Sequence, residues 1–157
     1  MPSAGKSTIG KELAEKLGYS FMDLDHMVEE KEGQSLISIL ETKGGPYFLD
    51  IEYSFLRQVK NDEKVVISTA GSIIYHAPAM EWLKNNTKVI YINTPLEIIE
   101  KRLAEKPKAV VGLKEKGLAK LAEERIPVYT KYADSIVDTT NKEPAQVIEE
   151  IISKLSL

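Results

Sequence analysis

The stretch Ala4-Gly5-Lys6-Ser7-Thr8 opens an amphipathic segment and supplies most of a Walker A motif, G-x-x-x-x-G-K-[ST]. A glycine before the lysine lets the backbone curl so that several N–H groups face a phosphate, and the N-terminus of the following helix adds partial positive charge. The lysine reaches the β- and γ-phosphates, and the hydroxyl after it is placed to bind Mg²⁺. The motif therefore predicts a nucleotide-binding loop formed by Ser3, Ala4, Gly5, Lys6, Ser7 and Thr8.

The segments that follow alternate between helical and strand patterns. Ile9, Leu13 and Leu17 recur at helical spacing within residues 6–17, and Gly18 is a stop signal. Three short apolar runs rich in β-branched residues predict strands buried on both faces at residues 65–69, 89–92 and 135–137. A weaker pattern of the same kind lies at residues 20–22. This alternation predicts a single α/β domain, residues 1–157, in which a parallel sheet is flanked by helices.

Two further helices have recognisable starts. Thr94, Pro95 and Glu97 have the spacing of an N-cap, a first-turn proline and a capping-box glutamate, which predicts a helix through about residue 104. Pro144 begins a last helix with an apolar face. Ligands of parallel sheets bind beyond the carboxyl ends of the strands. Residues that directly follow each strand are therefore candidate site residues.

Composition excludes several classes of function. The net charge of −3 argues against a general nucleic-acid or anionic-membrane binder, which would carry a basic surplus. The absence of cysteine excludes disulfides, thiolate metal sites and cysteine catalysis. No apolar run approaches the roughly 18 residues of a membrane span, and no signal-peptide pattern is present. We expect a cytoplasmic protein with no nucleic-acid or membrane partner.

Motifs along the whole chain resemble those of the shikimate kinase family of P-loop small-molecule kinases. They are Asp23-Leu24-Asp25 after the second expected strand, residues 68–72 after the third, the stretch 105–112, Arg125-Ile126-Pro127-Val128-Tyr129, and residues 141–144. The resemblance implies a three-layer fold with a five-stranded parallel sheet, of which this chain lacks the first strand. It also implies ATP and Mg²⁺ as cofactors and a small hydroxyl compound as acceptor, in a monomeric enzyme.

The resemblance further implies a role for individual residues. Lys6 and Asp25 would be catalytic, and Ser7 and Asp23 would hold Mg²⁺. The acceptor would be bound by Asp25, Gly71 and Arg125, and adenine by Arg102 and Pro144. Residues 105–114 would form a lid over the site. The implied activity is transfer of a phosphoryl group from ATP to shikimate, giving shikimate 3-phosphate.

Simpler interpretations of these residues remain open at this point. Asp23 and Asp25 could be solvated loop acids, and Asp25 could be the N-cap of a helix that starts near His26. Arg125 could be an exposed charge on a helix. The GKST tetrapeptide could occur by chance at the start of a helix, although the alternating α/β pattern is the context that a phosphate loop requires.

Three departures from the family pattern bear on the acceptor. Leu49 stands where a second carboxylate-binding arginine is expected, and the glycine triplet after the third strand is Ala70-Gly71-Ser72. The lid carries Lys106 and Lys108 and no arginine. Neither leucine nor lysine reproduces the bidentate fork of arginine on a carboxylate. The alternatives are therefore a P-loop kinase for another small acceptor, or a nucleotide-binding module without turnover.

The start of the sequence carries an expectation of its own. Met1 lies inside the phosphate-loop motif, without the motif's first glycine and without the strand that should precede it. We expect the native chain to begin roughly ten residues earlier, the length of a strand with its lead-in, and to supply that glycine just before Met1.

Overall fold

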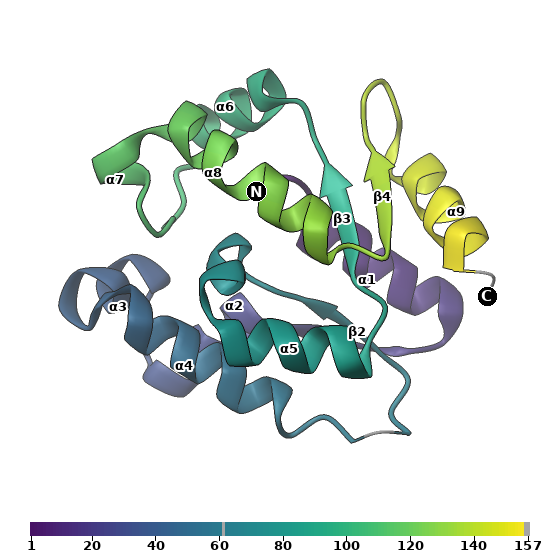
Figure 1. Cartoon of the computed structure of the whole chain (residues 1–157), viewed down its shortest axis with the longest axis horizontal. Coiled ribbons are helices and arrows are strands. Elements are labelled where there is room, and N and C mark those ends of the chain that lie inside the picture. Colours follow the sequence, from purple (N-terminus) through teal and green to yellow (C-terminus); the bar gives the residue numbers. More distant parts are fainter. Residues whose placement is uncertain (61, 156–157) are drawn as a thin grey trace.

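Four short strands form two parallel pairs in the computed structural model, which describes residues 1–60 and 62–155 (Figure 1). They are β1 (Ser20–Asp23), β2 (Val65–Ser68), β3 (Ile90–Asn93) and β4 (Ser135–Asp138). β1 pairs with β2 from Ser20 opposite Val65, and β3 pairs with β4 from Ile90 opposite Ser135. The strand positions and the parallel α/β arrangement predicted from the sequence are confirmed.

An apolar slot of about 430 Å³ separates the two strand pairs. Its walls include Val66 and Ile67 of β2 and Ile90 of β3. Ile9 and Leu13, from the helix that follows the phosphate loop, complete the slot. Among the described residues β2 and β3 are not paired with each other, so the sheet layer consists of two separate ladders.

Helix α1 (Lys6–Leu17) begins and ends at the residues that the sequence predicts. Gly18 caps its C-terminus in a left-handed conformation, with backbone N–H bonds to the carbonyls of Ala14 and Glu15. The buried face of α1 carries Ile9 and Leu13 and packs on both β1 and β2, and α1 also contacts α9 (Pro144–Leu155). Helix α1 therefore connects the two ladders by side-chain packing.

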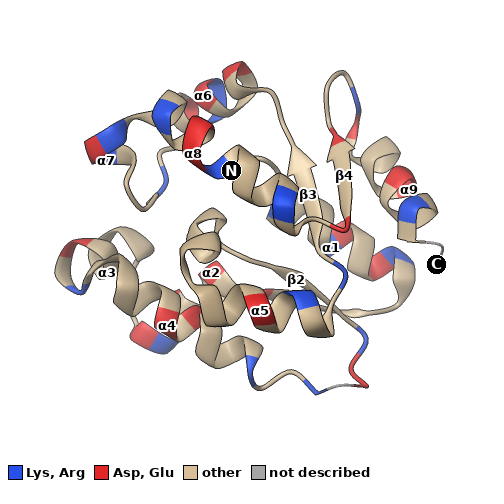
Figure 2. Cartoon of the chain, in the orientation of Figure 1, with Lys and Arg blue, Asp and Glu red and all other residues tan. Residues whose placement is uncertain are grey.

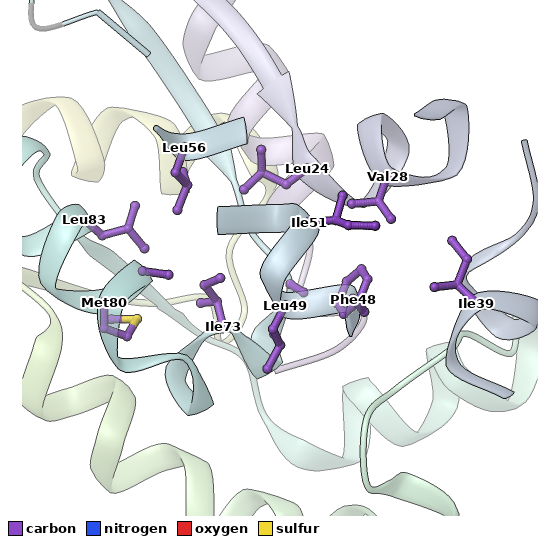
Figure 3. Close-up of a cluster of buried hydrophobic side chains, with 12 residues drawn as sticks. Leu24, Val28, Ile39, Phe48, Leu49, Ile51, Leu56, Ile73, Met80 and Leu83 are labelled. Carbon is purple, nitrogen blue, oxygen red and sulfur yellow. The ribbon is translucent and has the colours of Figure 1, made fainter. Parts of the chain in front are cut away.

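Helix α2 (Leu24–Glu32) packs on both strands of the β1–β2 ladder. Helices α3 (Leu36–Thr42) and α4 (Gly44–Leu56) pack on α2, and α5 (Ala77–Asn86) packs on α4. A 3₁₀ turn, η1 (Gly71–Tyr75), connects the carboxyl end of β2 to α5. A large cluster of buried hydrophobic side chains lies between these elements, and Figure 3 labels ten of them. They include Leu24 and Val28 of α2, Phe48 and Leu49 of α4, and Leu83 of α5.

Helix α9 packs on β4, and α8 (Leu118–Tyr132) contacts β3 through Tyr129 and Tyr91, whose ring centroids lie 5.1 Å apart. Helix α6 (Leu96–Glu105) packs on α8, and the short helix α7 (Leu113–Lys116) precedes α8. In Figure 1, α8 and α5 cross in front of the strands and α1 lies behind them, so that helices flank the strand layer on both sides. Basic and acidic residues are interspersed along the helices (Figure 2). No helix in the described part of the chain combines the length and the apolar character needed to cross a bilayer.

The predicted cap of the helix after β3 is wrong in one respect. The N-cap of α6 is Pro95, and no side chain caps it. The Thr94 hydroxyl donates instead to the carbonyl of Ala4 at 3.0 Å, a buried contact 90 positions away in sequence. Thr94 therefore ties the end of β3 to the phosphate loop, which local sequence patterns could not reveal.

Candidate active site

A cavity of about 640 Å³ opens at the carboxyl ends of the strands. Its wall is formed by the phosphate loop, by residues that follow β1, β2 and β4, and by the segment before α7. The candidate site residues on this wall are Ser3, Ala4, Gly5, Lys6, Ser7, Thr8, Asp25, Gly71, Arg102, Arg125 and Pro144. The fold thus brings together every residue of the predicted site except Asp23, which is not on the cavity wall.

Gly5, the last residue of the phosphate loop before α1 begins, has a backbone conformation that few other residues adopt. Gly5 has φ 97° and is the N-cap of α1, and a Cβ at this position would lie 3.3 Å from Ile9 Cδ1. No side chain caps the helix. The first backbone N–H groups of an α-helix have no intrahelical partner, so this end of α1 offers donors and a positive dipole to an anion in the cavity.

Lys6 and Ser7 begin α1 on the floor of the cavity. The Lys6 ammonium donates to the carbonyl of Met1 at 2.8 Å, which folds the side chain back over the loop. Burial lowers the pKa of Lys6, and the carboxylate of Asp25 opposes this effect. The Ser7 hydroxyl lies 3.5 Å from that of Ser68, at the end of β2.

Arg102 and Pro144 approach the loop from the β3–β4 half of the molecule. Arg102 of α6 donates from Nη1 to the carbonyl of Ser3 at 3.0 Å. Pro144 is the first residue of α9 and follows the loop after β4, whose Asn141 has φ 54°. Both residues lie on the cavity wall with the phosphate loop. They frame the part of the cavity where the family resemblance places adenine.

The two aspartates after β1 have different environments. Asp23 is the N-cap of α2, with its side chain accepting from His26 N at 3.5 Å, so the alternative that Asp25 caps this helix is wrong. Asp25 lies in the first turn of α2 and on the cavity wall. Its Oδ1 atom is buried and has no hydrogen-bond partner within residues 1–60 and 62–155. Burial raises the pKa of Asp25, and Lys6 counteracts this.

Arg125 is 1% exposed, so the alternative of an exposed helix charge is wrong. It projects from α8 and donates from Nε to the Tyr75 hydroxyl at 3.3 Å and from Nη2 to the Val111 carbonyl at 2.6 Å. Its guanidinium also lies over the Tyr75 ring, 5.2 Å from the centroid. A buried guanidinium on a cavity wall is suited to hold a carboxylate.

Gly71 follows β2 at a point where a side chain does not fit. A Cβ at Gly71 would lie 2.9 Å from the Tyr129 hydroxyl and 3.4 Å from Arg125 Nη1. Tyr129 donates to the Gly71 carbonyl at 2.8 Å, and burial raises the pKa of Tyr129 to about 12. Tyr129 is therefore un-ionised and keeps its proton for this bond, which fixes Gly71 beside Arg125.

The segment expected to form a lid lies against the cavity. Lys106, Lys108, Val110 and Val111 are on its wall. The positive charge of Lys108 acts on both Lys6 and Asp25, lowering the pKa of each. Lys108 therefore acts on the charged groups at the centre of the site.

Leu49 and Glu52 occupy the inner side of α4. Leu49 is 6% exposed and belongs to the hydrophobic cluster around Ile73 (Figure 3). Glu52 is fully buried and accepts a hydrogen bond from Ala70 N at 2.8 Å. Leu49 therefore brings no charge to the cavity, whereas Arg125 lies on its wall.

Sequence reasoning missed several residues that shape the site. The Thr94 hydroxyl donates to the Ala4 carbonyl of the phosphate loop, and the Tyr129 hydroxyl donates to the Gly71 carbonyl. Thr139 and Asn141 follow β4 on the cavity wall, and the rule that ligands bind beyond strand ends could have identified both. Tyr129 belongs to the motif that begins at Arg125, and Thr94 was predicted to be an N-cap, but neither pattern indicated a partner that is distant in sequence.

A parallel α/β fold with a phosphate loop, a buried carboxylate and a buried arginine around one cavity defines a P-loop kinase for a small molecule. Comparison with known proteins names the family: the sequence profile of shikimate kinase matches residues 2–156, and the chain belongs to the shikimate kinase family. Shikimate kinase of Persephonella marina is 34% identical over 97% of this chain and 93% of the relative.

Solved structures agree with this assignment. The shikimate kinase of Acinetobacter baumannii in complex with shikimate superposes with a TM-score of 0.86 at 31% identity, covering 98% of this chain and 87% of that one. The enzyme of Aquifex aeolicus gives a TM-score of 0.76 at 33% identity, covering 98% of this chain and 90% of that one.

Proposed function

We propose that this protein transfers the γ-phosphoryl group of ATP to a hydroxyl of shikimate, giving shikimate 3-phosphate and ADP. The observation that carries the proposal is the cavity that joins the phosphate loop to Asp25 and the buried Arg125. Family membership supports it, since curated relatives are named shikimate kinase and one structural neighbour contains shikimate. Residues 1–157 would act as one kinase domain, with residues 105–114 as its lid.

In this proposal the phosphate loop binds the triphosphate of ATP. The backbone N–H groups at the uncapped N-terminus of α1 contact the β-phosphate. The Lys6 ammonium gives up its hydrogen bond to the Met1 carbonyl and binds the β- and γ-phosphate oxygens instead. Adenine lies between Arg102 and Pro144. Charge neutralisation at the phosphates supplies most of the catalysis that the protein provides in such reactions.

The acceptor binds on the other side of the cavity. Arg125 holds its carboxylate, and Asp25 and Gly71 position the reacting hydroxyl. That hydroxyl oxygen forms a bond to the γ-phosphorus while the bond to the β–γ bridging oxygen breaks, and Asp25 takes the hydroxyl proton. A carboxyl pKa raised by burial suits this role, because the group is a better base than an exposed aspartate.

The donor set also fits Mg²⁺. Ser7 and Asp23 present a hydroxyl and a carboxylate at the starts of α1 and α2, and hard oxygen donors are the ligands that Mg²⁺ prefers. Asp23 also caps α2 and is not on the cavity wall, so it would act through a water. When bound, the ion would neutralise charge on the β- and γ-phosphates.

An ADP-release assay with shikimate, ATP and Mg²⁺ tests the proposal, and mass spectrometry of the product locates the phosphate. We expect shikimate-dependent ADP formation over many turnovers. ADP formation equal with and without shikimate would refute the proposal.

Leu49 favours a second candidate, a P-loop kinase for another small hydroxyl compound. Its side chain packs in the core, so a carboxylate in the cavity meets one arginine where the family pattern has two. A panel of polyols, hydroxy acids and nucleosides in the same assay decides between the two. ADP stabilising the fold with no acceptor turned over would instead indicate a nucleotide-binding module.

A further inference from the structure

Glu52 is a carboxyl group on the apolar side of α4. It is 0% exposed, and Phe48, Leu49, Ile51 and Leu56 of the same helix are also buried. Placing a carboxyl group in such surroundings is costly unless its oxygens are hydrogen-bonded. The mechanism described above does not use this side chain.

One oxygen of Glu52 has a specific partner and the other has none. Oε1 accepts a hydrogen bond from the backbone N–H of Ala70 at 2.8 Å. Oε2 is buried without a hydrogen-bond partner in the part of the chain that the structure describes. Leu49, which stands where the family pattern has an arginine, offers no positive charge to this oxygen. Glu52 of this chain therefore acts on Ala70.

Ala70 stands at the start of the turn that borders the acceptor side of the cavity. The Ala70 carbonyl accepts from Ile73 N at 3.2 Å, which closes η1, and residues 70–72 line the cavity. Tyr129 of α8 holds the next residue through the Gly71 carbonyl. The turn is thus fixed at two successive residues, by α4 on one side and α8 on the other.

We propose that Glu52 is a positioning residue for the acceptor, which holds Ala70 and thereby sets the place of Gly71 beside Arg125. The proposal rests on the proposed function, because it assigns Gly71 to the acceptor. Glu52 itself does not contact the acceptor, since it is not on the cavity wall.

The protonation state of Glu52 follows from its surroundings. Burial raises the pKa of Glu52 to about 8, Asp25 adds to the shift, and the Ala70 N–H opposes it. The other charged groups that act on it are Lys6 of α1 and Asp23 of β1. At neutral pH the Ala70 N–H is therefore bound mainly by an uncharged acid, which a glutamine side chain reproduces in shape and charge.

Steady-state kinetics of two variants test this role. Glu52→Gln keeps an oxygen acceptor for Ala70, whereas Glu52→Met fills the space without one. We expect the shikimate KM of Glu52→Met to rise at least about fivefold, while ADP stabilises the variant as it does the wild type and Glu52→Gln stays within about twofold of it. Asp50→Asn, which changes an exposed carboxylate of the same helix, serves as the control. An unchanged shikimate KM in a folded Glu52→Met protein overturns the proposal.

A second measurement does not depend on Glu52→Met being folded. The amide-proton NMR shift of Ala70 is expected to titrate with Glu52 in the wild type and to stay flat in Glu52→Gln. An Ala70 shift that is also flat in the wild type overturns the positioning role whatever the turnover. A titrating shift in a wild-type protein that does not phosphorylate shikimate supports the Glu52–Ala70 contact and refutes only the proposed function.

Discussion

Arg125 Nη2 donates a 2.6 Å hydrogen bond to the carbonyl of Val111, which connects the arginine proposed to bind the acceptor to the segment proposed as a lid. Val111 also packs against α4, since a Cβ at Gly45 would lie 3.2 Å from Val111 Cγ1. A carboxylate that binds Arg125 competes with this carbonyl for the same guanidinium donors. Acceptor binding and the position of the lid are therefore expected to influence each other.

Arg125→Lys removes the planar fork and keeps the charge. We expect the kcat/KM for shikimate to fall by about 10- to 100-fold, because one charge-assisted hydrogen bond contributes about 1.5–3 kcal/mol. The KM for ATP should change little. Initial-rate kinetics with each substrate varied measure both effects. Arg57→Lys, an exposed arginine stacked on Tyr53, is the matched control, and equal losses in the two variants would contradict the role of Arg125.

Lys6→Met removes the ammonium that approaches the phosphates and keeps most of the aliphatic stem. We expect kcat to fall by about 100-fold or more, since loss of a group that neutralises transition-state charge commonly has this effect. Stabilisation by ADP in a thermal-shift experiment should also weaken. Lys11→Met, an exposed residue of the same helix, should behave like the wild type. Wild-type turnover by Lys6→Met would disprove the assignment of the phosphate site.

Lys108→Ala tests whether a lid lysine supplies charge to the site. Lys108 acts on both Lys6 and Asp25 from the cavity wall, so its removal is expected to lower kcat about tenfold with a smaller change in the acceptor KM. Lys108→Arg should retain activity, because arginine also carries a full positive charge. Lys101→Ala on the exposed surface of α6 is the control. A kcat unaffected by Lys108→Ala would remove the lid lysine from the mechanism.

Glu52 gives stability a defined pH dependence. Its pKa is raised from the ordinary 4.5 to about 8, so between these values the folded protein holds a proton that the unfolded chain has released. The free energy of unfolding should therefore fall as pH rises through this window, and Glu52→Gln should abolish this part of the slope. Urea unfolding of both proteins at about pH 5 and about pH 8.5 measures it. Parallel pH profiles for the two proteins would contradict the assignment.

The sequence predicted the elements that depend on local patterns. The bounds of α1 followed from the spacing of Ile9 and Leu13 and from Gly18. Strands β2, β3 and β4 followed from their β-branched runs, and β1 from a shorter apolar pattern. The phosphate loop was predicted because its chemistry requires contiguous residues. Asp25, Gly71 and Arg125 were placed by resemblance, and the fold brings them to one cavity.

Contacts between distant residues were beyond this reasoning. The bond from Thr94 to Ala4 competes with a local cap, and no periodicity reports which partner is preferred. Glu52 is fully buried, although a charged residue on a helix is usually exposed. Both residues are polar groups whose partners are main-chain atoms, and main-chain atoms carry no sequence signal.

The division of the strand layer has a consequence for how the two substrates would meet. Asp25 and Gly71, assigned to the acceptor, follow the strands of one ladder, whereas Thr139 and Pro144 follow β4 of the other. Helix α1 packs on β1 and β2 and also contacts α9, so the phosphate loop at its start lies against elements of both sides. The acceptor would contact Asp25 of α2, Gly71 of η1 and Arg125 of α8. A bound acceptor would therefore hold these three elements in fixed relative positions while its hydroxyl meets the phosphate loop.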